Sequence, residues 1–430
     1  MLLIFTFSLI VLVVKSRVMS TASIVSIGNE LLIGHKTDTN ATYICQQLLS
    51  IGIPVVSVYT VADEVSQIVR ALKRAAEDAE IVIATGGLGP TDDDLTRQAF
   101  AEFLGVELQT DSKLLETIRR FFEKRGLPMP DKNTIQACIP AGAEPIENPL
   151  GTAPGIFVQK RGKLLFALPG VPVEMKQMFE NTVLSCLRQQ GGGRFVVVKK
   201  VRCFGAGESA IAEKLGDLMD RRRNPLINST VDSGIITLHI VASAPSKEQA
   251  EDKAQADLDR LKSLLGDLAF GVDDQTLPEV VGQELARQQK TIAVAESCTG
   301  GLLAKLLTDI PGSSEYFTQG WITYSNKAKT EQLGVSPELI EKHGAVSEEV
   351  ASAMAIAARQ KAGTDFAIAI TGIAGPAGGT EQKPIGLVYI SVSSHNNCIV
   401  RRFLFTHTRE LVRIRAAFAA LNMLRLKLKS

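Results

Sequence analysis

The chain has 430 residues, of which 45% are hydrophobic and 22% are charged. At roughly 150 residues per domain this length predicts about three domains, and the composition excludes a disordered, collagen-like or multi-span membrane protein. Forty-seven basic residues against 46 acidic ones leave a net charge of +1, so no global positive field draws the chain to a polyanion. We therefore do not expect nucleic acid as a partner.

Cysteine and histidine are few and scattered. The six cysteines include no C-x-x-C pair, and the chain has five histidines. This pattern argues against a zinc knuckle and against a disulfide framework, and it suits a reducing cytosol. We expect a cytoplasmic protein.

The amino-terminal segment is apolar. Its first 14 residues, MLLIFTFSLIVLVV, carry no charge, but a membrane-spanning helix needs roughly 18–20 such residues. A signal peptide would have a basic segment before the run and a small-residue cleavage site after it, whereas Lys15 and Arg17 follow the run. Because Met19 precedes a strand-like segment that could open a domain, we interpret residues 1–18 as an extension or a start site placed too early. The alternative is a membrane anchor, and we expect no membrane partner.

Residues 23–104 alternate short β-branched runs with helical periodicity. Strands are predicted at 24–28, 54–61 and 79–85, with helices at 40–50 and 64–77 between them. This order predicts right-handed βαβ crossovers and a parallel sheet, in which ligands bind at the carboxyl ends of the strands. The turns at 28–30 and 86–91 carry glycine and polar residues at such ends.

Two further regions follow a helix predicted at 112–125 and loops rich in Pro and Gly. The run Gly191–Gly193 is typical of a hinge. Beyond it, strands at 194–204 and 234–243 and a helix at 247–265 predict a small α+β connector without a catalytic constellation. The last region is predicted to be another α/β domain, with helices at 278–289, 300–307 and 347–360 and strands at 291–296, 365–371 and 386–393. The predicted domains are therefore 19–190, 191–275 and 276–430.

The segment TGGLGPTDDDLT, residues 85–96, follows a predicted buried strand and opens a predicted helix. Glycines let the backbone approach a phosphate, and the N–H groups of the first helical turn complete an anion site. Three consecutive aspartates would repel a bare phosphate, but a divalent cation could bridge carboxylate and phosphate. The alternative is that Asp92 to Asp94 only cap the helix.

A series of motifs in this domain resembles one protein family. The words IGNELLIG, TDTN, TGGLGPTDDDLT, NPLGTAPG and LPGVPVEMK, in this order over residues 23–187, resemble the amino-terminal half of the CinA family (competence-damage inducible protein A). Its fold is similar to that of molybdopterin-binding proteins of the MogA and MoeA type. The resemblance implies a nucleotide pocket and, in some members, a metal-dependent pyrophosphatase that splits ADP-ribose into AMP and ribose 5-phosphate.

The resemblance also implies two sets of site residues in this domain. The pyrophosphate would lie against Gly86, Gly87, Gly89 and Thr91. A divalent metal of unspecified identity would be held by Glu30, Asp38, Asp92, Asp93 and Asp94. Position 29 is Asn here, where relatives often have Thr or Asp.

AESCTGG, residues 295–301, places Ser297 at the end of a predicted buried strand, with Thr299 and Gly300 leading into a helix. A serine on such a turn suits a nucleophile, because following N–H groups can face a developing oxyanion. The alternative is a helix N-cap. Cys298 is the rival nucleophile, but its thiolate would need a histidine or another cation, and no histidine is near in sequence.

A serine nucleophile needs a base. The segment GWITYSNKAKTEQLGV, residues 320–335, supplies Tyr324, Lys327 and Lys329. A desolvated lysine can stay neutral and accept the serine proton, although a single lysine is usually a solubilising surface charge.

The whole set of motifs in this region points to one family. AESCTGG, PGSS, TYSNKAK, HGAVS, TGIAGPAGG and KPIGLVY, over residues 277–424, closely resemble the CinA carboxy-terminal domain, the nicotinamide mononucleotide deamidases. The resemblance implies a serine–lysine amidohydrolase that converts nicotinamide mononucleotide and water to nicotinic acid mononucleotide and ammonia without a metal. Ser297 would attack the carboxamide, Lys329 would take its proton, and Tyr324 would orient or relay. The nucleotide would contact Thr299, Gly300, Thr371, Gly372 and Arg409, with Arg413 as the alternative to Arg409.

These expectations describe a multidomain α/β enzyme. It would have a molybdopterin-binding-like parallel-sheet domain, a small α+β connector and an α/β amidohydrolase domain, and it would act on small nucleotides in pyridine nucleotide salvage. Family resemblance suggests a homodimer. The rival hypothesis is a non-catalytic nucleotide- or molybdopterin-binding scaffold protein for competence or cofactor assembly.

Overall fold

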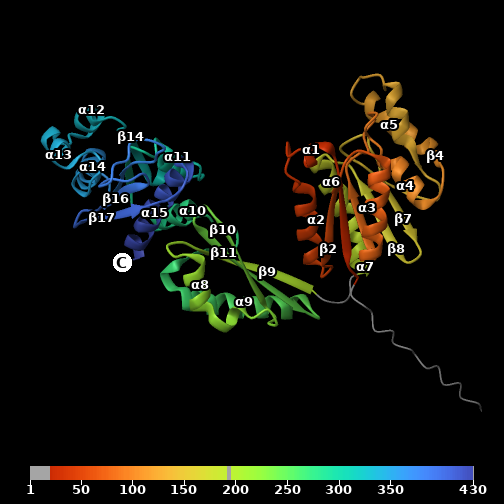
Figure 1. Cartoon of the computed structure of the whole chain (residues 1–430), viewed down its shortest axis with the longest axis horizontal. Coiled ribbons are helices and arrows are strands. Elements are labelled where there is room, and N and C mark those ends of the chain that lie inside the picture. Colours follow the sequence, from red (N-terminus) through yellow and green to blue (C-terminus); the bar gives the residue numbers. More distant parts are fainter. Residues whose placement is uncertain (1–19, 191–194, 430) are drawn as a thin grey trace, which may run out of the picture. The chain divides into compact units, whose positions relative to one another are not determined.

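The computed structural model describes residues 20–190 and 195–429. They form two compact units: the first holds residues up to 197 together with 243–250, and the second holds 198–242 and residues from 251 on (Figure 1). The segment 1–18 and the glycine hinge predicted at Gly191–Gly193 lie outside the described residues. Within 20–190 and 195–429, no helix is both long enough and apolar enough to cross a membrane.

The first unit is built on a six-stranded sheet with the strand order β2-β1-β3-β8-β7-β6. The first four strands in this order are parallel, and β7 and β6 are antiparallel to their neighbours. Every residue of β1 and β3 is buried, as expected for strands covered on both faces. The strands are β1 (Ala22–Ile27), β2 (Val55–Val61), β3 (Ile81–Thr85), β6 (Glu144–Ile146), β7 (Gly155–Lys160) and β8 (Lys163–Leu168).

Helices cover both faces of this sheet (Figure 1). Because side chains alternate along a strand, neighbouring residues of β1 enter opposite cores: Val25 packs with α3 and α4, and Ile24 packs with α2, α6 and α7. The helices are α1 (Asn29–Leu32), α2 (Thr39–Ser50), α3 (Val65–Asp78), α4 (Thr96–Leu104), α5 (Ser112–Glu123), α6 (Pro172–Met178) and α7 (Leu184–Gln190), and a short hairpin pairs β4 (Leu108–Thr110) with β5 (Cys138–Pro140).

The connector is a four-stranded sheet with two helices. Its strand order is β10-β11-β9-β12. The sequence predicted β9 (Phe195–Cys203), β11 (Ile235–Ala244) and α9 (Lys247–Leu265), while β10 (Leu226–Asp232) and β12 (Ala269–Val272) are additional; α8 is Glu208–Leu215. In the second unit the connector packs on the carboxy-terminal helix, where the rings of Phe204 and Phe418 meet edge to face at 6.3 Å and the buried Arg425 donates to the carbonyl oxygen of Asp267.

The carboxy-terminal domain has a five-stranded sheet with the order β14-β13-β15-β16-β17. Strands β14, β13 and β15 are parallel, and β16 and β17 are antiparallel. Helices α10, α11 and α15 pack on one face, and α13 and α14 pack on the other. The elements are α10 (Leu277–Arg287), β13 (Ile292–Glu296), α11 (Leu302–Thr308), β14 (Phe317–Ile322), α12 (Asn326–Ala328), α13 (Pro337–His343), α14 (Glu348–Ala362), β15 (Phe366–Gly372), β16 (Leu387–Ser393), β17 (Cys398–Leu404) and α15 (Arg409–Lys429).

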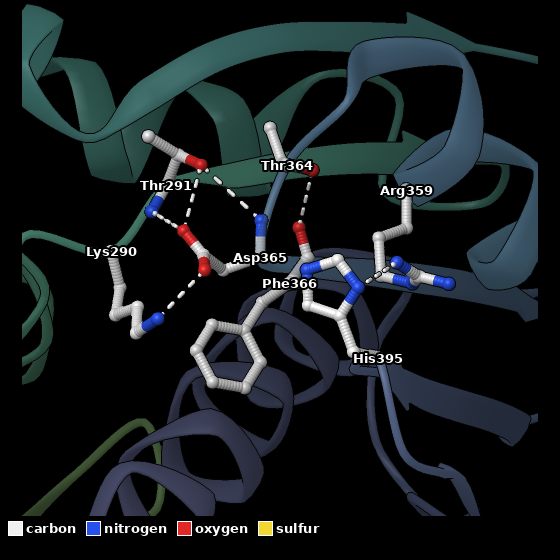
Figure 2. Close-up of polar contacts among 7 residues, drawn as sticks. All are labelled: Lys290, Thr291, Arg359, Thr364, Asp365, Phe366 and His395. Atoms are coloured by element: carbon white, nitrogen blue, oxygen red, sulfur yellow. Dashed lines mark hydrogen bonds and ion pairs between the residues drawn. The ribbon is translucent and has the colours of Figure 1, made fainter.

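A polar cluster joins the amino ends of β13 and β15 (Figure 2). The Asp365 carboxylate accepts hydrogen bonds from the Thr291 N–H at 2.9 Å and hydroxyl at 3.1 Å, and it pairs with Lys290 at 2.8 Å. These bonds fix the parallel register of the two strands, in which Glu296 lies opposite Ile370. The turn after β13 therefore begins beside the carboxyl end of β15.

Candidate active site

The turn after β13 carries Ser297. Its N–H donates to the carbonyl oxygen of Ile370 at 3.0 Å, which ties the turn to β15. Gly300 and Gly301 follow with φ of +60° and +93°, a region that side chains with a Cβ rarely adopt. At Gly301 a Cβ would also lie 3.1 Å from the side chain of Ile322. The two glycines thus let the chain turn sharply from β13 into α11.

A second segment brings Lys329 under this turn. After β14, the Ser325 hydroxyl accepts the Ala328 N–H at 3.0 Å and begins a short helix. This helix widens into a π-helical turn over Lys329–Leu333, a deviation that is frequent at functional sites. The Lys329 side chain points inward and is 1% exposed.

The Lys329 amine lies 3.1 Å from the hydroxyl oxygen of Ser297. Its other neighbours are the carbonyl oxygens of Thr323 at 2.8 Å and Tyr324 at 3.4 Å. A neutral amine has two N–H donors and one lone pair. The two carbonyls can take the two N–H groups, which leaves the lone pair to accept the Ser297 proton.

The surroundings of Lys329 disfavour its charged form. Within the described chain, no carboxylate lies within ion-pair distance of its amine, and burial lowers the pKa of Lys329. The neighbouring Lys327 is the opposite case, because its side chain is 79% exposed and lies 3.7 Å from Glu331. Of these two lysines, Lys329 is the one suited to act as a base near neutral pH.

Cys298 is a core residue. Burial raises the pKa of its thiol to about 12, so the thiol stays protonated at neutral pH. It belongs to the hydrophobic cluster that includes Val294 and Leu303. The side chain that meets the base is the hydroxyl of Ser297, which is 8% exposed.

Thr299, two residues after Ser297, offers free donors. Within the described residues, no acceptor is found for its N–H group, whereas the N–H of Cys298 hydrogen-bonds to its own thiol and Gly300 donates to the Ser297 carbonyl at 3.1 Å. The buried Thr299 hydroxyl also has no partner in this part of the chain. Backbone donors of this kind are what an oxyanion requires.

Two arginines of α15 adjoin the site. Arg409 donates to the carbonyl oxygen of Gly375 at 2.6 Å and to the Tyr324 hydroxyl at 3.0 Å, while Arg413 donates to the Thr299 carbonyl at 2.7 Å. In the described chain neither guanidinium pairs with a carboxylate. Tyr324 is 60% exposed, and its hydroxyl meets Arg409 rather than Ser297.

The two residues predicted on β15 have structural partners. The buried Thr371 hydroxyl donates to the Ala345 carbonyl at 2.8 Å. At Gly372 a Cβ would lie 2.8 Å from the Leu387 carbonyl oxygen, so the close approach of β16 is enough to require glycine. Their contact with a nucleotide stays a prediction.

In the first unit, two glycines are required by the fold of the predicted phosphate loop. A Cβ at Gly86, with φ of +104°, would lie 2.1 Å from the Ile27 carbonyl oxygen, and one at Gly87 would lie 2.4 Å from the Thr96 hydroxyl. That hydroxyl donates to the Gly86 carbonyl at 2.7 Å. The loop therefore packs tightly between β1 and α4, and its contact with a pyrophosphate stays a prediction.

The aspartates beside this loop do not cap a helix. Helix α4 has Leu95 at its N-cap and no side-chain cap, so the capping alternative is wrong. Instead, the Asp94 carboxylate accepts the Gly89 N–H at 2.7 Å and the Thr91 N–H at 2.8 Å, and the Thr91 hydroxyl also donates to it. Asp94 closes the loop on itself.

The acidic residues predicted to hold a metal do not form a ligand set. Among the residues the structure describes, no group of three or more His, Cys, Asp or Glu side chains could hold a metal ion. Asp94 is bound within its loop, and Asp92 is 95% exposed and lies 3.4 Å from Lys132. Two of the others have different partners, since Asp38 caps α2 and Glu30 pairs with Lys36 at 3.8 Å.

Asp93 lies close enough to Asp63 to affect its titration. Burial is the first cause that raises the pKa of Asp63, and the charges of Glu30, Asp93 and Asp94 raise it further.

One residue that contacts the loop from α4 was missed by sequence reasoning. Arg97 is buried, and its guanidinium donates to the carbonyl oxygens of Leu88 and Gly89. The sequence could have indicated it by its position, because Arg97 lies on the same helical face as the buried Phe100 and Leu104. An arginine on an apolar stripe indicates a bracing role.

Comparison with known proteins assigns the chain to a family. Sequence models match residues 23–189 as a probable molybdopterin binding domain, 198–271 as the damage-inducible protein CinA KH domain and 274–428 as the CinA C-terminal domain. A CinA-like protein from Synechocystis sp. is 43% identical over 414 residues, which is 95% of this chain and 99% of that protein. The chain belongs to the CinA family. A CinA-like protein from Gloeothece citriformis is 42% identical over 413 residues, with the same coverage.

A third relative agrees with this assignment. The protein from Moorella thermoacetica, which bears a competence-damage inducible name, is 43% identical over 398 residues, or 92% of this chain and 96% of its own length. The predicted family and the predicted multidomain α/β fold class, with a molybdopterin-binding-like domain, are confirmed.

Proposed function

We propose that the carboxy-terminal domain is an amidohydrolase that converts nicotinamide mononucleotide and water to nicotinic acid mononucleotide and ammonia. The observation that carries this proposal is the buried Lys329 amine 3.1 Å from the Ser297 hydroxyl, with only neutral acceptors around it. A protein that merely bound a nucleotide would gain nothing from a desolvated lysine, because burial of an unpaired amine costs stability. The pair therefore favours an enzyme over the scaffold hypothesis.

The first half of the reaction forms an acyl-enzyme. The neutral Lys329 amine accepts the proton of Ser297 while the serine oxygen forms a bond to the carboxamide carbon. The carbonyl oxygen becomes an oxyanion, and the N–H and hydroxyl of Thr299 are the free donors that could bind it. Collapse of this intermediate breaks the carbon–nitrogen bond, and the Lys329 ammonium returns the proton so that ammonia leaves.

The second half reverses the roles of the same groups. Water attacks the acyl carbon and gives a proton to Lys329, the bond to the serine oxygen breaks, and that oxygen recovers the proton. Nicotinic acid mononucleotide leaves, and Ser297 and Lys329 return to their initial states. No step needs a metal or a redox cofactor.

The charge of the site suits a phosphate-bearing substrate. Arg409 and Arg413 lie one helical turn apart on α15, and both hydrogen-bond to neutral oxygens: Arg413 to the Thr299 carbonyl in the turn after Ser297, and Arg409 to the Gly375 carbonyl and the Tyr324 hydroxyl. A guanidinium that lacks a carboxylate partner keeps its attraction for an anion. Two such groups support a mononucleotide over an uncharged amide.

The test is ammonia release from nicotinamide mononucleotide by the full chain. Ser297→Ala and Lys329→Met should each lower kcat by at least about a hundredfold, the usual worth of a nucleophile or general base. The matched control is Lys327→Met, which removes an exposed lysine two residues away and should leave the rate within about twofold. Equal, measurable rates in wild type and Ser297→Ala would remove the proposed nucleophile. No ammonia release by the wild type would favour the scaffold hypothesis.

ADP-ribose hydrolysis by the amino-terminal domain stays a separate prediction. Because the acidic residues there do not form a ligand set in the described chain, no step through a metal is derived. The assay is AMP release from ADP-ribose by the full chain with Mg²⁺, Mn²⁺, Co²⁺ or Zn²⁺. Release that needs a metal and persists in Ser297→Ala would support a second site, and no release with any of these metals would remove it.

A further inference from the structure

The residue before the candidate nucleophile is a fully buried glutamate. Glu296 is the last residue of β13. Its carboxylate accepts hydrogen bonds from the N–H groups of Gly301 at 3.0 Å, Leu303 at 3.1 Å and Ala304 at 2.8 Å. These donors belong to the start of α11, whose N-cap residue Gly301 has no side chain to satisfy them. The carboxylate therefore holds the far end of the turn that carries Ser297.

The main chain of Glu296 holds the other half of the pair. Its carbonyl oxygen accepts the N–H of Thr323 at 2.8 Å. The Thr323 carbonyl in turn accepts the Lys329 amine at 2.8 Å. Glu296 is therefore linked to both members of the pair. Its carboxylate binds the end of the turn that carries Ser297, and its carbonyl binds Thr323, which in turn binds Lys329.

We propose that Glu296 is a positioning residue for the Ser297–Lys329 pair, an inference that rests on the proposed function. A carboxylate suits this place because both oxygens only accept hydrogen bonds, and all three neighbouring groups are donors. By fixing where the turn leaves β13 and where α11 begins, Glu296 sets the path of the residues in between. A displacement of about 1 Å in a reacting group can cost a hundredfold in rate.

Two substitutions separate the requirements of charge and reach. Glu296→Gln keeps the length but turns an NH₂ group toward backbone N–H donors. Glu296→Asp keeps the acceptor oxygens but is one methylene shorter. The control is Glu279→Gln on α10, where a half-buried glutamate accepts the N–H and hydroxyl of Thr276 in a capping box. It removes helix-capping bonds from the same domain at a helix that carries neither Ser297 nor Lys329.

The experiment measures the reactivity of Ser297 with a fluorophosphonate, together with kcat and KM for nicotinamide mononucleotide, on folded full-length protein. In the labelling step the serine oxygen bonds to phosphorus, fluoride leaves and the serine proton passes to Lys329. Glu296→Gln should slow labelling and lower kcat by about tenfold to a hundredfold, with KM within about threefold. Glu296→Asp should lie between this variant and wild type. Glu279→Gln should label at the wild-type rate.

Each outcome decides the assignment. Wild-type labelling rates in both Glu296 variants, or an equal loss in Glu279→Gln, would overturn it. If Glu296→Gln does not fold, Glu296→Asp gives the decision. A wild-type protein that labels at Ser297 but releases no ammonia would refute the proposed substrate, while slow labelling of the Glu296 variants would still support the positioning role. A wild-type Ser297 that does not label would overturn both, because an unactivated hydroxyl needs no positioning.

Discussion

The contact between Ser297 and Lys329 predicts that the losses in catalytic rate from removing each residue do not add up. A general base contributes about 10²–10⁴-fold to a rate, which is about 2.7–5.4 kcal/mol at 1.36 kcal/mol per tenfold. If the two residues acted independently, removing both would cost the sum of two such terms. The 3.1 Å separation of their reacting atoms implies a single device, since a base without its nucleophile does nothing.

The assay is the double-mutant cycle of Ser297→Ala, Lys329→Met and the combined variant, read as kcat/KM for ammonia release. The combined variant should fall within about threefold of the slower single variant. Lys329→Arg extends the test, because a guanidinium stays charged and cannot act as a base near neutral pH, and it should be as inactive as Lys329→Met. Additive losses, or an active Lys329→Arg protein, would refute the reasoning.

Three further predictions follow from single side chains. Cys298→Ala should keep kcat within about threefold, measured by ammonia release, whereas inactivation of a folded variant would restore the thiol as the nucleophile. Arg409→Ala should raise KM for nicotinamide mononucleotide by about tenfold or more, from a lost charge-assisted bond, but not for nicotinamide riboside, which lacks the phosphate; an equal effect on both would contradict phosphate binding. Asp365→Asn should lower the free energy of unfolding by about 1–3 kcal/mol at pH 7, followed by the fluorescence of the chain's one tryptophan, Trp321. Partial burial alone would raise the pKa of Asp365, but hydrogen bonds from Lys290 and Thr291 lower it. The stability difference between wild type and Asp365→Asn should therefore disappear as the pH falls below about 3.9 and through the lowered pKa. A difference that persists at that low pH would show that the carboxylate bonds are not its source.

The alternation of strands and helices could be predicted from the sequence. Runs such as TIAVAE and DFAIAIT are short and rich in β-branched or small residues, with glycine in the turn that follows, and β13 and β15 lie there. The long helix α15 was not predicted, although 10 of its residues are buried. Its buried face mixes alanine with leucine and includes Arg425, which weakens the apolar periodicity.

The site was readable only as residue types. The motifs single out Ser297 and Lys329, but no local pattern tells a buried lysine from an exposed one, and Lys327 and Lys329 lie two residues apart on the same segment. Their difference arises from the π-helical turn and from the packing of β14 against β13. The role of Glu296 was hidden for the same reason, since its partners are backbone N–H groups that a sequence does not distinguish.

The central claim is that the Lys329 amine is neutral when the enzyme works. Its titration can be followed directly by NMR of the full chain with ¹³Cε-labelled lysine, with the Lys329 signal assigned by its absence in Lys329→Met. We predict a pKa clearly below the ordinary lysine value of about 10.4, because burial without a counter-charge disfavours the ammonium, and an acid limb of kcat/KM at the same pH. A Lys329 that titrates at or above the ordinary value would contradict the account.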